Sequence, residues 1–326
     1  MRPIKISVAM TSFNGEKFII KQLESIISQT LVPNEVIICD DQSKDNTVGL
    51  VERFIEENDL EGWSIVRNVE NLGWKRNFYK AASLTSGDIV FFSDQDDIWL
   101  PQKIKTMTDI MVEKKAGCVY GRKTIIDSND RPLLERQEQR SFTNEINQVD
   151  FSKSFFTRKV LGCCMCINRR IVDLYLSVNY PDAGHDSQCA RIALLYDTLW
   201  ELDSPVIQYR IHSNNTSGIS ADVSFGASTK SKRCSEIQVS IDWMTKLLHR
   251  NDLDLEKKEI MKKCIVAQNN RLEYFEPTSK RTFVTLFRFV PYYSGLTMLV
   301  GDFAYKHNIN RKMGRLRWKL GNRGSL

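Results

Sequence analysis

Apolar and polar positions follow two different periods over the first hundred residues. Short apolar runs typical of buried strands alternate with stretches in which apolar residues recur at helical spacing. The predicted strands are 4–10, 36–39, 64–66 and 89–92, and the predicted helices are 16–29, 48–55 and 73–84. This alternation of strand and helix predicts an α/β fold, with a mostly parallel sheet flanked by helices.

Polar residues follow each of these predicted strands. Thr11–Asn14 follows the first strand, Asp40–Ser43 the second, Asn68–Asn71 the third and Asp94–Asp97 the fourth. Because the carboxyl ends of parallel strands meet at one edge of a sheet, these four loops lie together in the predicted fold. Three acids directly behind a buried strand indicate a ligand site at that edge.

Two common phosphate-binding motifs are absent from the sequence. The loop after the first strand contains neither G-x-G-x-x-G nor G-x-x-x-x-G-K-[ST]. Clustered carboxylates repel phosphate, but they bind Mg²⁺ or Mn²⁺, which in turn binds phosphate. The chemistry that fits best is a divalent cation holding a phosphorylated ligand.

The second half of the chain is less regular. We predict a helix over 101–112, a strand over 118–126, a polar loop over 127–150 and a strand over 160–167. Helices over 169–176 and 186–195 and a strand over 205–211 follow, and the pattern is wholly helical from about 231. A Ser- and Gly-rich stretch separates the two parts, so we place a boundary near 225, with domains at 1–225 and 226–326.

Several short motifs resemble family 2 glycosyltransferases with the GT-A fold, over about residues 4–218. The matching segments are Val8–Asn14, Cys39–Thr47, Asn71–Gly73 with Arg76-Asn77, Ser93–Trp99, Gly162-Cys163, Asn168-Arg169, His185-Asp186 and Tyr209–His212 with Asn214-Asn215. Ser93–Trp99 is similar to bacterial enzymes that build O-antigen, capsule or rhamnose-rich polysaccharides. The resemblance implies transfer of a sugar from a nucleotide-diphosphate donor.

The resemblance also implies a metal site. Asp94 and Asp96 correspond to the D-x-D motif of the family and would hold Mg²⁺ or Mn²⁺, with Asp96 the expected direct ligand. His212 corresponds to a histidine that completes the metal shell in some relatives; the alternative is a structural hydrogen-bond partner. Asp97 would orient metal-bound waters or the donor sugar, or cap the helix after Pro101.

Donor binding is the role implied for a larger set of residues. These are Thr11, Ser12, Phe13, Asn14, Glu16, Asp40, Asp41, Asn71, Arg76, Asp94, Asp97 and Trp99. Asp40 and Asp41 would read the base and ribose, Arg76 would contact the diphosphate, and Trp99 would stack on a sugar. The alternatives are a helix cap for Asp41, a solvated position for Arg76 and a core position for Trp99.

An inverting transfer needs a general base on the acceptor side of the sugar. The residue that matches the family is Asp186, at the start of a predicted helix, where the alternative role is a helix cap. Arg210 and Asn214 are candidate contacts to phosphate or acceptor. The expected enzyme transfers rhamnose from TDP-rhamnose, or a hexose from UDP, to a lipid-linked saccharide in cell-surface polysaccharide synthesis. The alternative is a sugar-nucleotide-binding or nucleotidyltransferase-type α/β protein without glycosyl transfer.

Composition and charge refine this picture. The 326 residues carry a net charge of +6, but residues 230–326 hold 20 Lys and Arg against nine acids. Such an uneven charge disfavours a nucleic-acid-binding surface on the catalytic domain. Short apolar segments beside the basic end suit a helix at the cytoplasmic membrane surface, with a helical hairpin that caps the catalytic domain as the alternative.

Location is inferred from the cysteines and from the hydropathy. The longest stretch without charged residues, Phe289–Gly301, is too short to span a bilayer, and we see no signal peptide. Cys163 and Cys166 form a lone C-x-x-C, which we interpret as small apolar residues in a buried strand. We therefore expect a cytoplasmic protein, peripheral on the inner face of the plasma membrane.

Overall fold

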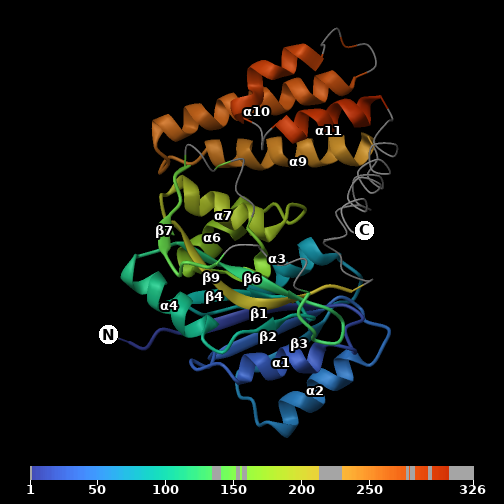
Figure 1. Cartoon of the computed structure of the whole chain (residues 1–326), viewed down its shortest axis with the longest axis vertical. Helices are drawn as coiled ribbons and strands as arrows, with labels where there is room; N and C mark the ends of the chain where they lie inside the picture. Colours follow the sequence, from blue (N-terminus) through green and yellow to red (C-terminus); the bar gives the residue numbers. More distant parts are fainter. Residues whose placement is uncertain are drawn as a thin grey trace. The chain divides into compact units, whose positions relative to one another are not determined.

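The computed structural model describes residues 2–133, 141–151, 155, 160–212, 230–276, 279, 283–292 and 296–307. The chain forms two compact units, one made of residues 1–152 and 159–212 and the other of residues 153–158 and 213–326. The boundary predicted near 225 and the candidate residue Asn214 lie outside the described residues. Figure 1 shows the elements of both units.

The first unit is built on a nine-stranded sheet. Its strands are β1 (Ile6–Ser12), β2 (Glu35–Asp40), β3 (Trp63–Arg67), β4 (Ile89–Ser93), β5 (Ile98–Trp99), β6 (Cys118–Ile126), β7 (Ile146–Gln148), β8 (Met165–Asn168) and β9 (Leu199–Arg210). The order is β3-β2-β1-β4-β8-β6-β9-β5, with β7 also paired to β9. Strands β1 to β4 run parallel, as the sequence predicts, whereas β8 is antiparallel to both of its neighbours.

Helices cover both faces of this sheet. They are α1 (Ile19–Ile27), α2 (Thr47–Glu57), α3 (Trp74–Leu84), α4 (Lys103–Glu113), α6 (Arg169–Val178) and α7 (His185–Leu195). In Figure 1, α1 and α2 lie on one face, and α3, α6 and α7 lie on the other. Because both faces are covered, β1 and β4 are buried along their whole length and are mostly apolar on both faces.

The strand predicted over 160–167 is wrong in its first half. Residues Gly162–Cys164 form a 3₁₀ helix, η2, and β8 begins only at Met165, where the chain enters the gap between β4 and β6. β9 starts at Leu199, before the predicted strand. The short strands β5 and β7 were not predicted, because two or three residues carry no readable period.

The second unit is helical in its described part, as predicted. Its elements are α9 (Lys230–Leu248), α10 (Leu255–Phe275), the 3₁₀ helix η3 (Phe283–Tyr292) and α11 (Leu296–Lys306). One apolar cluster joins Ala267, Tyr274, Leu286 and Leu299, and a second joins Ile237, Ile241, Phe275 and Tyr305. Among the described helices, none has both the length and the hydropathy needed to cross a bilayer.

Candidate active site

The loops after β1, β2 and β4 meet at the carboxyl edge of the parallel strands. The register aligns Ser12 with Asp40 and Met10 with Ser93, so the three strands end almost level. Gln95, the middle residue of the D-x-D motif, joins two of these loops. Its amide accepts from the Phe13 N–H at 2.8 Å and donates to the Phe13 carbonyl at 3.0 Å. Gln95 could not be singled out from the sequence, because its role depends on this long-range contact.

The loop after β1 is also tied to the loop after β2. The Asn14 N–H donates to Ser43 Oγ at 2.8 Å, and Asn14 Oδ1 accepts from the Lys44 N–H at 2.7 Å. Glu16 Oε2 accepts from the Asn46 N–H at 2.9 Å. Thr11 and Ser12 are buried, whereas Phe13 is 46% exposed. Asn14 and Glu16 thus shape the loops, and the Phe13 side chain is left facing solvent.

Asp40 and Asp41 both use their carboxylates inside the fold. Asp40 accepts from Ser12 Oγ at 3.0 Å and from the Ser43 N–H at 2.9 Å. Asp41 accepts from the backbone N–H groups of Leu72 and Gly73 at 2.7 and 2.8 Å, just before α3 begins. Its backbone carbonyl accepts from Asn71 Nδ2 at 2.9 Å. Asp41 therefore does not cap the next helix, α2, whose N-cap is Asn46, and its bonds instead order the loop that contains Asn71.

Two predicted contact residues, Arg76 and Trp99, are engaged elsewhere. Arg76 forms a two-bond ion pair with Asp182, with Nε and Nη2 2.7 and 3.1 Å from the two carboxylate oxygens, and both side chains are exposed. Trp99 is only 2% exposed and packs under the Lys103 ammonium, 3.5 Å from its ring centroid. A buried ring cannot stack on a sugar, so the core alternative for Trp99 replaces the donor contact.

Arg210 is a buried residue rather than an exposed phosphate or acceptor contact. Its side chain is fully buried, and Nε donates to the Asp96 carbonyl at 2.7 Å. Its backbone N–H donates to Asp97 Oδ1 at 3.1 Å, and its guanidinium also pairs with Asp130. The guanidinium therefore fixes the loop after β4 from inside the protein. Arg210 and His212 are only two positions apart, and their sequence does not indicate that the two side chains differ in exposure.

Asp96 and His212 form a pair at this edge. His212 Nε2 lies 2.8 Å from Asp96 Oδ2, although the two residues are 116 positions apart in the sequence. The Phe18 ring packs against the imidazole, with ring centroids 4.7 Å apart. The side chain of Asp96 is 15% exposed, and that of His212 is 11% exposed. A carboxylate oxygen and an imidazole nitrogen converging in this way fit a divalent cation such as Mn²⁺ or Mg²⁺.

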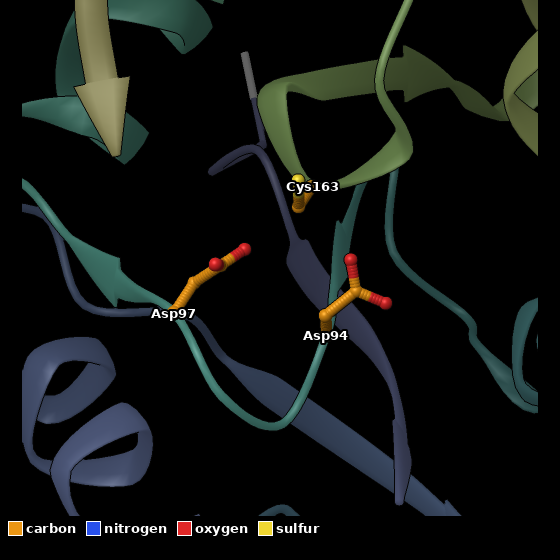
Figure 2. A group of neighbouring side chains, drawn as sticks. All are labelled: Asp94, Asp97 and Cys163. Carbon is orange, nitrogen blue, oxygen red and sulfur yellow. The ribbon is translucent and has the colours of Figure 1, made fainter. Parts of the chain in front are cut away.

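A second group of ligand atoms lies beside this pair. The carboxylates of Asp94 and Asp97 and the Cys163 thiol place one atom each within 4.8 Å of one another (Figure 2). Burial and the charge of Asp96 raise the pKa of Asp94 to about 7, and hydrogen bonding with the Cys163 thiol opposes that rise. Burial and the charges of Asp96 and Asp94 raise the pKa of Asp97 well above its usual value. Such perturbed carboxylates are characteristic of functional sites.

Lys103 supports the turn that carries Cys163. Its ammonium donates to the Cys163 carbonyl at 2.6 Å, and the side chain is almost completely buried. Burial lowers the pKa of Lys103 to about 8. Neither Lys103 nor Cys163 was predicted as part of the site, because one lies in an ordinary helical pattern and the other in an apolar run.

Asp186 stands in the first turn of α7, where its Oδ1 accepts from the Ser187 N–H at 2.6 Å. Its charge helps to raise the pKa of Asp94, so the two carboxylates are electrostatic neighbours. The preceding residue, His185, is 3% exposed and packs between Phe78 and Phe92, with ring centroids 4.0 and 4.4 Å away. Burial lowers the pKa of His185 to about 4, which keeps the imidazole neutral. The candidate base, Asp186, therefore lies in the first turn of α7, next to the buried ring of His185.

Comparison with known proteins points to one enzyme family. The sequence model described as glycosyl transferase family 2 matches residues 7–174. The dTDP-rhamnosyl transferase RfbG of Shigella flexneri is 32% identical over 239 residues, which cover 68% of this chain and 77% of that protein. The UDP-Glc:alpha-D-GlcNAc-diphosphoundecaprenol beta-1,3-glucosyltransferase WfgD of Escherichia coli is 30% identical over 38% of this chain and 47% of its own length.

Solved structures agree at the level of the fold. The chain resembles S. aureus TarS 1–349 in complex with UDP-GlcNAc, with a TM-score of 0.61, 16% identity, and coverage of 98% of this chain and 92% of that one. It also resembles the mannosyltransferase PcManGT from Pyrobaculum calidifontis in complex with GDP-Man and Mn²⁺, with a TM-score of 0.55 and 15% identity over 95% and 88% of the chains. The predicted GT-A fold is confirmed.

Proposed function

Because the chain belongs to glycosyl transferase family 2, we propose that it transfers a sugar from a nucleotide-diphosphate donor to a lipid-linked saccharide, with inversion at the sugar carbon. The observation that carries the proposal is the pairing of Asp96 with His212 at the sheet edge, where the Asp94 carboxylate lies within electrostatic reach of Asp96 and Asp186. Membership of the family makes the chain a glycosyltransferase. The donor, the acceptor and the roles of these residues are proposed.

Asp94, Asp96 and His212 would hold Mg²⁺ or Mn²⁺. The ion supplies positive charge that offsets the negative charge developing on the leaving diphosphate. Arg210 keeps the Asp96 backbone and the Asp97 carboxylate in place from inside the fold. The loops after β1 and β2, joined by Asn14 and Gln95, form the rest of the donor site. Phe13, exposed on the first of these loops, is the side chain we expect to pack on the nucleotide base.

Asp186 acts as the general base. Its carboxylate takes the proton of the acceptor hydroxyl while that oxygen attacks the sugar carbon from the side opposite the diphosphate. Proton transfer and attack on the carbon then occur in one step, which gives inversion.

The name of RfbG makes TDP-rhamnose the first donor to examine, and that of WfgD makes UDP-glucose the second. We propose a lipid-linked acceptor and a role in cell-surface polysaccharide synthesis on the same grounds. Peripheral attachment to the inner face of the plasma membrane is part of the proposal. It is supported by the basic end of the chain and by exposed apolar side chains in η3 and α11, including Phe287 and Phe303.

The test is donor turnover by the purified protein. Hydrolysis of TDP-rhamnose, UDP-glucose, UDP-GlcNAc and GDP-mannose is measured with Mn²⁺, with Mg²⁺ and with a chelator. We expect turnover of one thymidine or uridine donor that the chelator abolishes. Turnover that is unchanged by the chelator would contradict the role of Asp94, Asp96 and His212, and inactivity with every thymidine and uridine donor would contradict the donor class.

A further inference from the structure

Asp94, Asp97 and Cys163 form a ligand set that the donor-binding role of the D-x-D motif does not explain. The two carboxylates come from the loop after β4, and the thiol comes from η2, about 70 residues later in the chain (Figure 2). One ligand atom from each of the three side chains lies within 4.8 Å of the other two. Asp97 is 1% exposed and Cys163 is 3% exposed, so these two side chains are shielded from bulk water.

One oxygen in this set has no partner. Asp97 Oδ1 accepts from the Arg210 N–H, but the buried Asp97 Oδ2 has no hydrogen-bond partner among the described residues. A buried carboxylate oxygen without a partner is costly, and nearly all such atoms in folded proteins are satisfied. Lys103, the nearest buried ammonium, donates to the Cys163 carbonyl and not to this oxygen. A bound cation would satisfy the oxygen directly.

We propose that Asp94, Asp97 and Cys163 bind a thiophilic divalent cation of the Zn²⁺ type, beside the Asp96–His212 pair. Thiolates select borderline and soft ions, whereas Mg²⁺ prefers oxygen ligands alone. Zn²⁺ accepts one thiolate and two carboxylates at separations that a cluster of this size reaches with small side-chain rotations. The Cys163 thiol loses its proton to solvent when the ion binds, and its sulfur becomes the third ligand.

Asp94 belongs to both ligand sets. If the proposed function holds, an ion bound to Asp94, Asp97 and Cys163 withdraws Asp94 from the cation that holds the donor diphosphate. Zn²⁺ is then an inhibitor that competes with Mn²⁺ or Mg²⁺, and the Cys163 thiol is the residue that makes the enzyme sensitive to it.

Cobalt titration tests the site without donor or turnover. Co²⁺ bound to a thiolate gives a sulfur-to-metal charge-transfer band, which we expect in the wild type at one ion per chain and which Zn²⁺ should remove. Cys163→Ser should abolish the band, and Cys166→Ser, three positions further along the same segment, should retain it. Asp97→Asn should weaken Co²⁺ binding by at least about tenfold. Absence of the band in the wild type, or its persistence in Cys163→Ser, overturns the proposal.

X-ray absorption at the zinc edge provides a measurement that needs no variant. The wild type loaded with one Zn²⁺ should show one sulfur neighbour at about 2.3 Å and oxygen neighbours at about 2.0 to 2.2 Å. A shell made only of oxygen and nitrogen overturns the proposal, even if Cys163→Ser fails to fold.

The two proposals fail separately. A thiolate–metal band in a protein that turns over no nucleotide sugar retains this site and removes the proposed function. Metal-dependent turnover without the band retains the function and removes the site. When both are present, Zn²⁺ should lower Mn²⁺-dependent turnover, and excess Mn²⁺ should restore it.

Discussion

Asp186 is the residue on which we expect sugar transfer to depend most. Asp186→Asn keeps the size and most of the hydrogen bonding of the side chain but cannot accept a proton from the acceptor. We expect kcat to fall by roughly a hundredfold to ten-thousandfold, while the Kd of the donor changes little. Transfer to acceptor and donor binding by calorimetry are the two measurements.

A matched control for this substitution is available on the neighbouring helix. Asp173 lies on α6 with 65% of its side chain exposed, and Asp173→Asn removes the same charge away from the site. Its kcat should equal that of the wild type. If Asp186→Asn and Asp173→Asn transfer sugar equally well, Asp186 is not the base.

His185 should make the stability of the protein depend on pH. Its folded pKa of about 4 lies below the value of about 6.5 expected in the unfolded chain, because burial disfavours the imidazolium. The contribution of neutral His185 to the free energy of unfolding is therefore complete above pH 6.5 and is lost as the pH falls toward 4. It amounts to about 3 kcal/mol at most, since each pH unit between the two pKa values contributes about 1.4 kcal/mol.

Urea unfolding of the wild type and of His185→Leu between pH 7 and pH 4 measures this contribution. Leucine cannot be protonated and suits the apolar space between Phe78 and Phe92. The wild type should lose more free energy of unfolding than the variant over this range. Equal losses would mean that His185 titrates normally in the folded protein.

Sequence reasoning predicted a candidate site at the sheet edge but could not assign its hydrogen bonds. Asp94, Asp96 and Asp97 were predicted as candidates because strand ends are readable from periodicity. Gln95, Lys103 and Cys163 were missed, since each acts through a residue distant in the sequence. Trp99 and Arg210 were assigned contacts with the donor or acceptor because their residue types suit such contacts. Their burial became visible only in the packed structure.

At the scale of elements, the parallel half of the sheet was predictable and the mixed half was not. β1 to β4 alternate with helices in a repeating pattern, so their direction follows from the connections. β8 has four residues and inserts between β4 and β6 in the opposite direction. Nothing in its local pattern encodes that direction, because it is set by where the flanking segments lie in the fold.

A buried charge network joins three helices of the second unit. Asp302 on α11 is fully buried and accepts from Arg271 on α10 at 2.6 and 2.8 Å and from Arg233 on α9 at 3.0 Å. Asp302→Asn leaves the buried Arg271 guanidinium without its counter-charge. We expect the helical unit to lose about 3 to 5 kcal/mol of stability, measured as an earlier thermal transition by circular dichroism.

An exposed ion pair in the same unit provides the control for this network. Glu259 and Lys262 are both about 60% exposed on α10, and exposed pairs contribute little. Lys262→Ala should leave the transition where it is in the wild type. A similarly small shift for Asp302→Asn would show that the three helices are held by their apolar clusters alone.

At the scale of the whole molecule, charge and exposed aromatic surface coincide in the second unit. Residues 230–326 carry a net charge of +11, and the rings of Phe287 and Phe303 both pack on Phe283 while remaining 47% and 36% exposed. We call Phe283, Phe287 and Phe303 the aromatic patch. Aromatic rings beside cations are the combination that holds proteins at an anionic bilayer surface.

Sedimentation with lipid vesicles tests the proposed attachment to a membrane. The full chain should bind vesicles that contain anionic lipid, and binding should weaken as salt is added. Changing Phe287 and Phe303 together to Ser should reduce binding at least about tenfold, because two apolar side chains no longer enter the interface. Leu255→Ser, which removes a 78% exposed apolar side chain outside the patch, should have no effect. Unchanged binding by the double variant would exclude the aromatic patch as an anchor.

The late position of β8 and His212 in the chain has a consequence for synthesis of the protein on the ribosome. The first four strands are complete by Ser93, but the free edge of β4 is covered only when residues 165–168 emerge. Until then the nascent chain exposes an unpaired edge, which favours aggregation. The partner of Asp96 arrives later still, 116 residues behind it. A chain released early should therefore be insoluble and inactive, and the pairing of Asp96 with His212 can form only after the sheet is complete.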